Sequence, residues 1–484
     1  MFKKIKEFFR VLGELKYIIP LLKYKFPDPD DNESLAHSFE KTVEEFGNNN
    51  FIFFEDESWS YSETNKAANS LANKLVEDGV THSDRVVLFM ENRPDFIISI
   101  LALNKIGAIG VLINTSLTGK PLIHCINSSD SKKCIVGAEL AASLEAVLDE
   151  INIKDKEDIY WVEDGDRFIC PEWALSLKPL LDDSKDENLA ITNMVTAKDT
   201  AFYIFTSGTT GVPKAALFPN SKIIAASINI SKGGYRINDS DCMYNCLPLY
   251  HSTGLMLGLC ACVQVGAATF IRRKFSASAF WKEAKQFNTT AFVYVGELCR
   301  YLSFQDPSEE EKDNPISSMV GNGLRPDLWD CFRNRFNVER IVEIYGASEG
   351  NALFMNLLNK DETIGMTNAR VALFEYDVAE DKLVKDTESK FIEVGEGQPG
   401  LLLVEIGPDA IYNGYTDKKA SEEKVISNVF EEGDRWFNTG DLVKTMDVGF
   451  SLGRTHYQFV DRVGDTFRWK SENVSTNEVA EILN

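Results

Sequence analysis

Basic residues are scarce in this chain relative to acidic ones. Among its 484 residues, 51 are Lys or Arg and 74 are Asp or Glu, which gives a formal net charge of −23 at pH 7. Proteins that bind nucleic acid over a broad surface need basic side chains to neutralise phosphates. The charge balance therefore argues against a nucleic-acid partner, but it leaves room for one basic pocket that holds a small phosphorylated ligand.

Cysteine is neither abundant nor arranged in metal-binding pairs. The chain has nine cysteines, and the only close pairs are Cys242/Cys246 and Cys260/Cys262. Neither pair is accompanied by a second pair or by a histidine cluster at the spacing of a zinc site. The cysteines are therefore expected to be reduced core residues of a cytosolic protein.

Long uninterrupted apolar runs are also absent. The stretch 96–113 contains Asn104 and Lys105, and the stretch 254–271 contains Gln264 and is followed by Arg272–Lys274. A buried helix followed by a strand explains these patterns better than a membrane span does. The N-terminus has lysines but no clean apolar segment and no small-residue cleavage site, so no signal peptide is expected.

Residues 1–26 differ in charge from everything after them. They contain seven basic and two acidic residues, a net charge of +5, and large apolar side chains recur at helical spacing until Pro20 interrupts the run. One interpretation is a basic amphipathic helix that lies on an anionic bilayer, peripherally on the cytoplasmic face of a membrane. The alternative is a helix packed on its own protein with a solvated basic face. We favour the membrane-surface segment.

Helix-like and strand-like segments alternate after a linker at Pro27–Asp31. Helical spacing at 67–75 and 95–105 alternates with apolar strands at 85–90 and 108–113. This alternation predicts α/β layers with mostly parallel strands. The section 371–405 has shorter strands and more charge, which favours an antiparallel or barrel-like arrangement.

The most informative segment is Tyr203–Lys214, YIFTSGTTGVPK. An apolar strand at 201–205 runs into a loop of hydroxyls, glycines and one lysine: Thr206, Ser207, Gly208, Thr209, Thr210, Gly211 and Lys214. Glycines let backbone N–H groups approach phosphate oxygens, hydroxyls donate further hydrogen bonds, and the lysine supplies charge. The spacing is not that of the P-loop, and Ala215 follows the lysine. The segment predicts a polyphosphate site, and a plain polar turn is the alternative.

Other motifs place polar residues after apolar segments. They are LPLYHSTG (247–254) with His251; the turn VGNGLRPDLW (320–329) with Gly321, Asn322 and Gly323; IYGASEGN (344–351) with Tyr345, Gly346, Ser348 and Glu349; and WFNTGDL (436–442) with Asp441. A tyrosine ring can stack on a base, a glutamate can hold Mg²⁺ beside substrate phosphates, and an aspartate can accept from both hydroxyls of a ribose. By itself, each motif is only weak evidence for a nucleotide-binding site.

In this order, the motifs resemble those of the adenylate-forming superfamily, which includes acyl-CoA synthetases, luciferase and peptide-synthetase adenylation domains. The stretch 459–479, FVDRVGDTFRWKSENVSTNEV, resembles one branch in particular, as do YVGELCRYL at 294–302 and the GNGLRPD turn. That branch comprises the fatty-acid-transport proteins, also named very-long-chain acyl-CoA synthetases. The resemblance runs from about residue 50 to the end. Ser471 departs from it, because the branch usually has glycine there.

The resemblance implies a fold and a set of residue roles. The fold is a large domain, residues 27–463, with two stacked α/β subdomains, a small β-barrel and the active site in the groove between them. The implied catalytic residues are Thr206, Lys214, His251 and Glu349, where His251 closes the carboxylate end of the acyl pocket and Glu349 holds Mg²⁺. The implied nucleotide contacts are the 206–214 loop and Ser348 for phosphate, residues 321–323, Tyr345 and Gly346 for adenine, and Asp441 with Arg462 for the ribose side.

The implied reaction uses ATP and Mg²⁺ to convert a long- or very-long-chain fatty acid to acyl-AMP, and then CoA to form the thioester. The carboxylate is itself the nucleophile, so no Ser or Cys nucleophile is required. Two alternatives stay open: a ligase that passes the acyl group to a carrier protein, and a non-catalytic fatty-acid-binding or uptake module. The chain could be a monomer or a homodimer, and the sequence does not give the acyl chain length.

Superfamily members continue past a hinge, here near Gly464–Asp465, into a small mobile domain that supplies a further lysine. Residues 464–484 are too few to form a compact domain. The resemblance therefore implies that the chain as given adenylates poorly.

Overall fold

The computed structural model describes residues 2–153, 155–165, 168–181, 184–207, 213–346, 350–377, 380–407, 410–412, 414–463, 466–469 and 472–475. The chain forms two compact units. Unit 1 comprises Met1–Pro20, Asn322–Trp329 and Ile341–Asn484, and unit 2 comprises Leu21–Gly321 and Asp330–Arg340. The domain boundaries expected at 26/27 and 463/464 remain a prediction.

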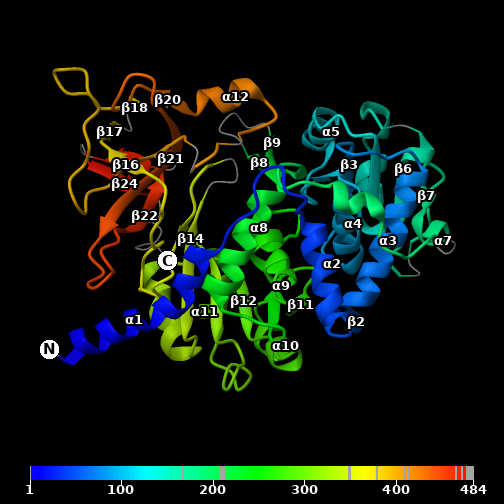
Figure 1. The fold of residues 1–484 in the computed structure, drawn as a ribbon, viewed down its shortest axis with the longest axis horizontal. Helices are drawn as coiled ribbons and strands as arrows, with labels where there is room; N and C mark the ends of the chain where they lie inside the picture. Colours follow the sequence, from blue (N-terminus) through cyan, green and yellow to red (C-terminus); the bar gives the residue numbers. More distant parts are fainter. Residues whose placement is uncertain are drawn as a thin grey trace. The chain divides into compact units, whose positions relative to one another are not determined.

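The first sheet of unit 2 has seven strands (Figure 1). Neighbouring strands are parallel except for the last pair, which is antiparallel. Apolar, β-branched runs such as RVVLF suit strands that are buried on both faces. In spatial order the strands are β7 (Leu175–Ser176), β6 (Ile159–Val162), β5 (Lys133–Gly137), β3 (Arg85–Phe89), β4 (Ile109–Leu112), β8 (Thr200–Ser207) and β9 (Pro213–Pro219).

Helices α2 (Leu35–Phe46), α3 (Tyr61–Glu77) and α4 (Pro94–Lys105) pack against one another in unit 2. A capping box fixes the start of α3: the Ser60 side chain accepts the N–H of Glu63, and the Glu63 carboxylate accepts the N–H of Ser60. Helix α4 is apolar on nearly every side and is buried along its whole length. Together with β4, it confirms the predicted helix and strand at 95–113.

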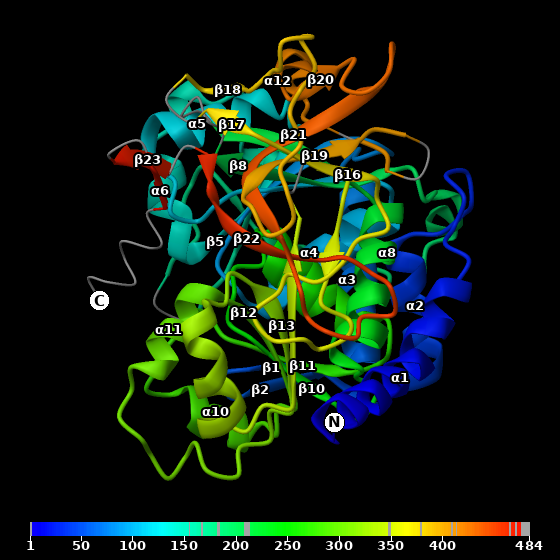
Figure 2. The same ribbon diagram turned by 90° about the vertical axis from the view of Figure 1, so that its left-hand side faces the viewer.

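A second, mixed group of strands in unit 2 carries the other predicted α/β layer (Figure 2). The pairs β12–β10, β10–β11 and β11–β1 are parallel, and the pair β1–β2 is antiparallel. The stretch 254–271 forms two helices and β11, as predicted, and no helix in the described part of the chain is long and apolar enough to cross a membrane. The strand order is β13 (Ser318–Asn322), β12 (Ala291–Val295), β10 (Cys242–Asn245), β11 (Ala268–Ile271), β1 (Asn50–Phe54) and β2 (Glu57–Ser60).

Further helices accompany these strands in unit 2. They are α5 (Gly119–Ser128), α6 (Ala141–Glu145), α7 (Leu177–Leu181), α8 (Asn220–Ile228), α9 (Ala261–Val263), α10 (Phe280–Gln286) and α11 (Gly296–Ser303), with the π-helices η5 (Asn229–Tyr235), η6 (Thr253–Cys260) and η8 (Cys331–Arg335). Short 3₁₀ turns occur at Ala138–Leu140, Leu148–Glu150, Lys156–Asp158 and Ala190–Met194.

Unit 1 contains an antiparallel sheet, as the charge-rich section 371–405 predicts. Its order is β16 (Val371–Phe374), β19 (Gly400–Glu405), β21 (Arg435–Met446) and β20 (Val425–Ser427), and β22 (His456–Arg462) also pairs with β21. Strands β20 and β22 pair with successive stretches of β21. The expected small closed barrel is wrong for the described residues, since β20 has only three residues and no strand pairing joins either β20 or β22 to β16.

The remaining elements of unit 1 are short. Strands β14 (Arg340–Tyr345) and β15 (Phe354–Met355) pair antiparallel, as do β17 (Tyr376–Asp377) with β18 (Lys382–Leu383) and β23 (Thr466–Trp469) with β24 (Glu472–Ser475). Helix α12 (Lys418–Glu423) starts where the Asp417 carboxylate accepts the N–H groups of Lys419 and Ala420. A 3₁₀ turn spans Pro326–Leu328.

The N-terminal segment forms helix α1 (Phe2–Lys23), which continues through Pro20. Val11 and Ile18 pack on Leu358 of unit 1, and the Arg10 guanidinium donates to the Leu358 carbonyl at 2.8 Å. The Lys360 ammonium forms an ion pair with Glu7. One face of α1 therefore packs on its own protein, which the sequence allowed as the alternative interpretation.

A second set of large apolar side chains on α1 is exposed. The exposed fractions are 47% for Ile5, 65% for Phe9, 42% for Ile19 and 64% for Leu22. Exposed lysines lie along the same helix at positions 4, 6, 16 and 23. Packing on unit 1 therefore uses only part of the apolar surface of this helix.

Candidate functional site

The predicted phosphate segment forms the edge hairpin of the seven-stranded sheet. In the β8–β9 pairing, Thr206 lies directly opposite Lys214, and Ser207 lies opposite Pro213. Directly paired residues point to the same face of a sheet. The hairpin therefore brings together one hydroxyl and the one lysine of the segment. Gly208, Thr209, Thr210, Gly211 and the side chain of Ser207 lie outside the described residues.

The hydroxyl of Thr206 is suited to a ligand with oxygen acceptors. Its Oγ1 atom is buried and has no hydrogen-bond partner within the described residues. Leaving a buried hydroxyl unsatisfied costs about 1–3 kcal/mol. A phosphate oxygen at this face of the hairpin would accept from Thr206 and interact with the charge of Lys214, so the residues present fit a polyphosphate.

His251 lies in the turn between β10 and η6. Its Nδ1 atom accepts the N–H of Thr253 at 3.3 Å, and its carbonyl accepts the N–H of Leu255 at 3.1 Å. Because Nδ1 is an acceptor, the neutral ring carries its proton on Nε2. His251 as a whole residue is exposed, yet protein atoms surround the imidazole, and this desolvation lowers its pKa. A neutral imidazole with a free Nε2–H can donate to a carboxylate.

Gly321 is the last residue but one of β13, at a point where this strand lies very close to β12. A Cβ atom at this position would lie 2.1 Å from the carbonyl oxygen of Tyr294, which is fully buried. Only glycine fits such an approach. The sequence motifs at 294–302 and 320–323 are therefore adjacent in unit 2 at this point.

A buried glutamate that the motif analysis missed holds the glycine-bordered turn in unit 1. The carboxylate oxygens of Glu343 accept the N–H groups of Gly323 at 3.0 Å and Leu324 at 2.9 Å. Glu343 is 4% exposed, and Gly323 has a positive φ of 79°. Asn322 and Gly323 are exposed. Glu343 precedes Tyr345 by two residues on β14, so both side chains lie on one face of the strand. That spacing is the signal that sequence reasoning could have used.

Tyr345, Asp441 and Arg462 form one hydrogen-bonded group in unit 1. The Tyr345 hydroxyl donates to Oδ2 of Asp441 at 2.5 Å, and Nε of Arg462 donates to Oδ1 at 3.2 Å. Asp441 and Arg462 are also direct partners in the β21–β22 pairing. Both carboxylate oxygens of Asp441 therefore accept hydrogen bonds, and a pair of ribose hydroxyls could take the place of the two donors.

Burial dominates the protonation behaviour of this group. Asp441 is 2% exposed, and desolvation raises the pKa of its carboxyl. Desolvation and the nearby Asp441 carboxylate also raise the pKa of the Tyr345 hydroxyl well above its ordinary value. The tyrosine thus stays a donor at neutral pH, and its ring packs edge-on against Phe354 at 5.5 Å between centroids.

The metal prediction falls on a part of the chain outside the described residues. Ser348 and Glu349 are in that part, whereas Gly346 is described and exposed. Within the described residues, no group of three or more His, Cys, Asp or Glu side chains could hold a metal ion. Magnesium binding by Glu349 remains a prediction.

All nine cysteines are free. Burial raises the pKa of Cys134, Cys246 and Cys260 to about 12. Such thiols are protonated at neutral pH and are poor nucleophiles. This agrees with a reaction in which no cysteine attacks the substrate.

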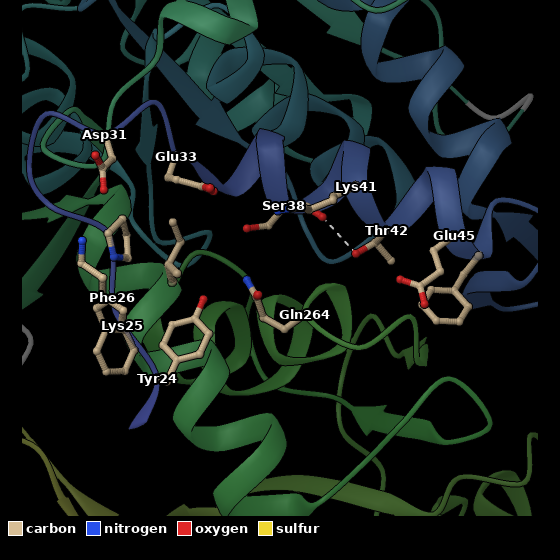
Figure 3. A pocket seen from close by; sticks show the side chains of 13 residues that line it. Tyr24, Lys25, Phe26, Asp31, Glu33, Ser38, Lys41, Thr42, Glu45 and Gln264 are labelled. Carbon is tan, nitrogen blue, oxygen red and sulfur yellow. Dashed lines mark hydrogen bonds between the residues drawn. The ribbon is translucent and has the colours of Figure 1, made fainter. Parts of the chain in front are cut away.

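The structure groups the predicted residues within each unit. Unit 2 holds Thr206, Lys214, His251 and Gly321, and unit 1 holds Asn322, Gly323, Tyr345, Gly346, Asp441 and Arg462. A cavity of about 300 Å³ in unit 2, lined by residues such as Tyr24, Glu33 and Gln264, contains none of them (Figure 3). A cavity of about 740 Å³ in unit 1, next to Tyr376 and Phe391, contains none either.

Comparisons with known proteins agree with these motifs. Residues 39–416 match the family described as AMP-binding enzyme. The chain is 37% identical over 455 residues to the medium/long-chain-fatty-acid–CoA ligase FadD6 of Mycobacterium tuberculosis, covering 94% of this chain and 73% of that protein. It is 38% identical over 443 residues to long-chain fatty acid transport protein 6 of mouse, covering 90% of this chain and 69% of that protein.

Solved structures share the fold. The anthranilate CoA ligase AuaEII in complex with anthranoyl-AMP has a TM-score of 0.76 at 18% identity, covering 95% of this chain and 82% of that one. The long-chain-fatty-acid–CoA ligase FadD1 of Archaeoglobus fulgidus has a TM-score of 0.70 at 20% identity, covering 91% and 86%. The predicted fold class, α/β with mostly parallel sheets, is confirmed.

Proposed function

Because the chain belongs to the AMP-binding enzyme family, we propose that it activates a long- or very-long-chain fatty acid in two half-reactions. First, a carboxylate oxygen attacks the α-phosphorus of ATP, a C–O–P linkage forms, and the bond to pyrophosphate breaks. Second, the sulfur of CoA attacks the acyl carbon, the thioester forms, and AMP leaves with the electron pair of the broken C–O bond. The thiol proton passes to solvent or to a base that we do not assign.

The observation that carries this proposal is the pairing of Thr206 with Lys214 on the edge hairpin. Negative charge accumulates on the phosphates as pyrophosphate departs, so fixed donors and a cation placed there lower the barrier. Thr206 donates a hydrogen bond and Lys214 supplies positive charge. Mg²⁺, with Glu349 as its proposed protein ligand, would neutralise further phosphate charge when bound.

The remaining site residues bind and orient the substrates. His251 donates from Nε2 to the fatty-acid carboxylate and holds it for attack. Asp441 accepts the ribose hydroxyls in exchange for its bonds to Tyr345 and Arg462. Tyr345, freed from Asp441, offers its ring to the adenine, and Asn322–Gly323 supply backbone at the other side of the base.

The test is a product assay with the 484-residue chain, ATP, Mg²⁺, CoA and fatty acids of increasing chain length. Because the implied lysine of the small domain is missing from this chain, we expect slow fatty-acid-dependent release of AMP and pyrophosphate, with one acyl-CoA for each AMP. Turnover with an acyl-carrier protein but not with CoA would favour the carrier-dependent ligase. Fatty-acid binding without any AMP formation would favour the non-catalytic module.

The exposed face of α1 supports a location at a membrane surface. Its apolar side chains and neighbouring lysines have the composition of a helix that lies in an anionic lipid interface. We place the protein on the cytoplasmic face of a membrane, with the other face of α1 packed on unit 1. Whether it acts as a monomer or a homodimer stays an open prediction.

A further inference from the structure

Asn92 lies outside every motif that the sequence singles out, yet its side chain contacts the segment that carries His251. It follows β3, the central strand of the first sheet, and is 5% exposed. Its Nδ2 atom donates to the carbonyls of Leu247 at 2.7 Å and Arg272 at 3.1 Å. Its Oδ1 atom accepts the N–H of Leu249 at 2.8 Å. Both N–H groups and the oxygen of this amide are therefore committed to backbone groups.

A second asparagine holds the other end of the same segment. Asn245, at the end of β10, donates from Nδ2 to the carbonyl of Gly254 at 2.9 Å and accepts the N–H of Leu247 at 3.3 Å. It is fully buried. The backbone is thus bonded to an amide side chain at 247, 249 and 254, and His251 lies between these points. The ring accepts the N–H of Thr253 at Nδ1, so its direction depends on this backbone.

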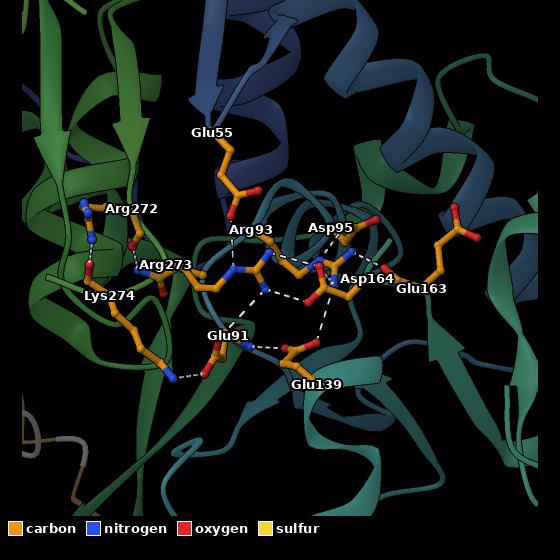
Figure 4. Close-up of polar contacts among 11 residues, drawn as sticks. Glu55, Glu91, Arg93, Asp95, Glu139, Glu163, Asp164, Arg272, Arg273 and Lys274 are labelled. Carbon is orange, nitrogen blue, oxygen red and sulfur yellow. Dashed lines mark hydrogen bonds and ion pairs between the residues drawn. The ribbon is translucent and has the colours of Figure 1, made fainter. Parts of the chain in front are cut away.

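A network of ion pairs fixes the backbone on either side of Asn92 (Figure 4). The N–H of Glu91 is accepted by Glu139 at 2.7 Å, and the Arg93 guanidinium donates to Asp95 at 2.7 Å. From the second sheet, Arg273 donates to both oxygens of Asp164 at 2.9 and 3.0 Å, and Lys274 pairs with Glu91 at 2.8 Å. Asn92 is therefore held by the first sheet while it bonds to loops of the second.

We propose that Asn92 is a positioning residue for His251. It fixes the backbone of Leu247–Leu249, so that the imidazole Nε2–H of His251 is directed at the carboxylate of the fatty acid. The proposal rests on the proposed function. It predicts a defect specific to the acyl substrate, because Asn92 bonds to the backbone of the segment that carries His251, whereas the phosphates of ATP are assigned to Thr206 and Lys214.

The main variant is Asn92→Asp, which keeps the size and shape of the side chain. It places a carboxylate oxygen where Nδ2 donates to the carbonyls of Leu247 and Arg272. We expect the KM for fatty acid to rise about tenfold or more while the KM for ATP changes less than about twofold. The matched control is Asn73→Asp on α3, whose amide also donates to two carbonyls, those of Asn69 and Lys185. The control should change neither KM. Asn92→Ser, which retains a donor, should show a smaller rise and serves if the aspartate variant does not fold.

A double-mutant cycle separates positioning from general destabilisation. In a His251→Ala background, Asn92→Asp should produce no further rise in the KM for fatty acid, because the residue that it positions is already gone. Additive effects, or equal rises in both KM values, would overturn the proposal.

A readout that does not need turnover distinguishes this inference from the proposed function. The imidazole titration of His251 is followed by NMR in the parent chain and in Asn92→Ser, which adds no charge that would itself raise the pKa, and the signal is assigned with His251→Ala. Loosening the backbone should move the histidine pKa upward toward its ordinary value, since the ring gains water. An unchanged titration would contradict the positioning role, even if no acyl-AMP is formed by either protein.

Discussion

Thr206 and Lys214 face each other across the edge hairpin, and this pairing decides which single substitutions are informative. Lys214→Ala should reduce pyrophosphate release by about 10²–10³-fold, as expected when a donor to developing phosphate charge is removed. Thr206→Val should reduce it less, by about tenfold, and should not lower the melting temperature, since valine removes an unsatisfied buried hydroxyl of nearly the same shape.

The control for both is Thr200→Val at the opposite end of β8, which should leave pyrophosphate release unchanged. If Lys214→Ala retained full activity, the hairpin would not be the phosphate site.

Asp441 gives a prediction in which function and stability move in different directions. Its carboxyl pKa is raised in the folded protein, chiefly by desolvation. A carboxyl with a raised folded pKa lowers the stability of the fold as pH rises from the unfolded pKa through the folded pKa, so at neutral pH the charge is a net cost. Asp441→Asn should therefore melt at the same or a higher temperature, while calorimetry finds weaker binding of AMP.

In Asp441→Asn, the amide oxygen can still accept from Arg462, and the amide NH₂ can donate to the hydroxyl oxygen of Tyr345. A large drop in melting temperature would therefore contradict this account of the group.

At the scale of single elements, α1 is the helix whose attachment depends on charge. The hydrogen bond from Arg10 lowers the pKa of Glu7 to about 2, with Lys360 contributing in the same direction. A carboxyl with a lowered folded pKa stabilises the folded arrangement above its unfolded pKa and loses that contribution as pH falls through the folded value. We expect amides of α1 to lose protection from hydrogen exchange as pH falls from about 4.5 to about 2.

Glu7→Gln should show weaker protection of α1 at neutral pH and little change over that acidic window. The buried contacts of Val11 and Ile18 remain in this variant, and each is worth about 1.5–3 kcal/mol when fully buried. A helix that stays equally protected at every pH in both proteins would show that the ion pair contributes nothing to its attachment.

At the scale of the whole molecule, the packed face and the exposed face of α1 predict how the protein binds to a lipid surface. Replacing Phe9 and Ile19 by serine should reduce co-sedimentation with vesicles that contain anionic lipid, because it removes exposed apolar area without touching Val11 or Ile18. Neutral vesicles should bind the parent chain less well, since about 1 kcal/mol is expected for each lysine near an anionic surface.

Two other exposed apolar residues supply a control for this experiment. Ile169 and Met194 are 91% and 71% exposed on unit 2. Replacing both by serine removes comparable apolar surface elsewhere, and vesicle binding should persist. Equal loss in both double variants would mean that binding is not a property of α1.

The sequence predicts the parts of this molecule that depend on local pattern. The alternation of apolar runs predicts β3, α4 and β4 close to their observed bounds, and the hydroxyl-rich segment is identified before its hairpin pairing is known. The contacts of Asn92 could not be predicted, because its side chain bonds to backbone groups that lie far away in the sequence. The packing of one face of α1 on unit 1, and the lack of a pairing that closes the antiparallel sheet among the described strands, likewise depend on tertiary contacts that no local period encodes.

The antiparallel hairpin has a consequence for how this protein can vary among species. The register of β8 and β9 places Thr206 directly opposite Lys214. One extra residue inserted within β9 itself would turn Lys214 to the opposite side of the sheet and leave Thr206 facing a different neighbour. Natural length variation should therefore be absent from the paired strands.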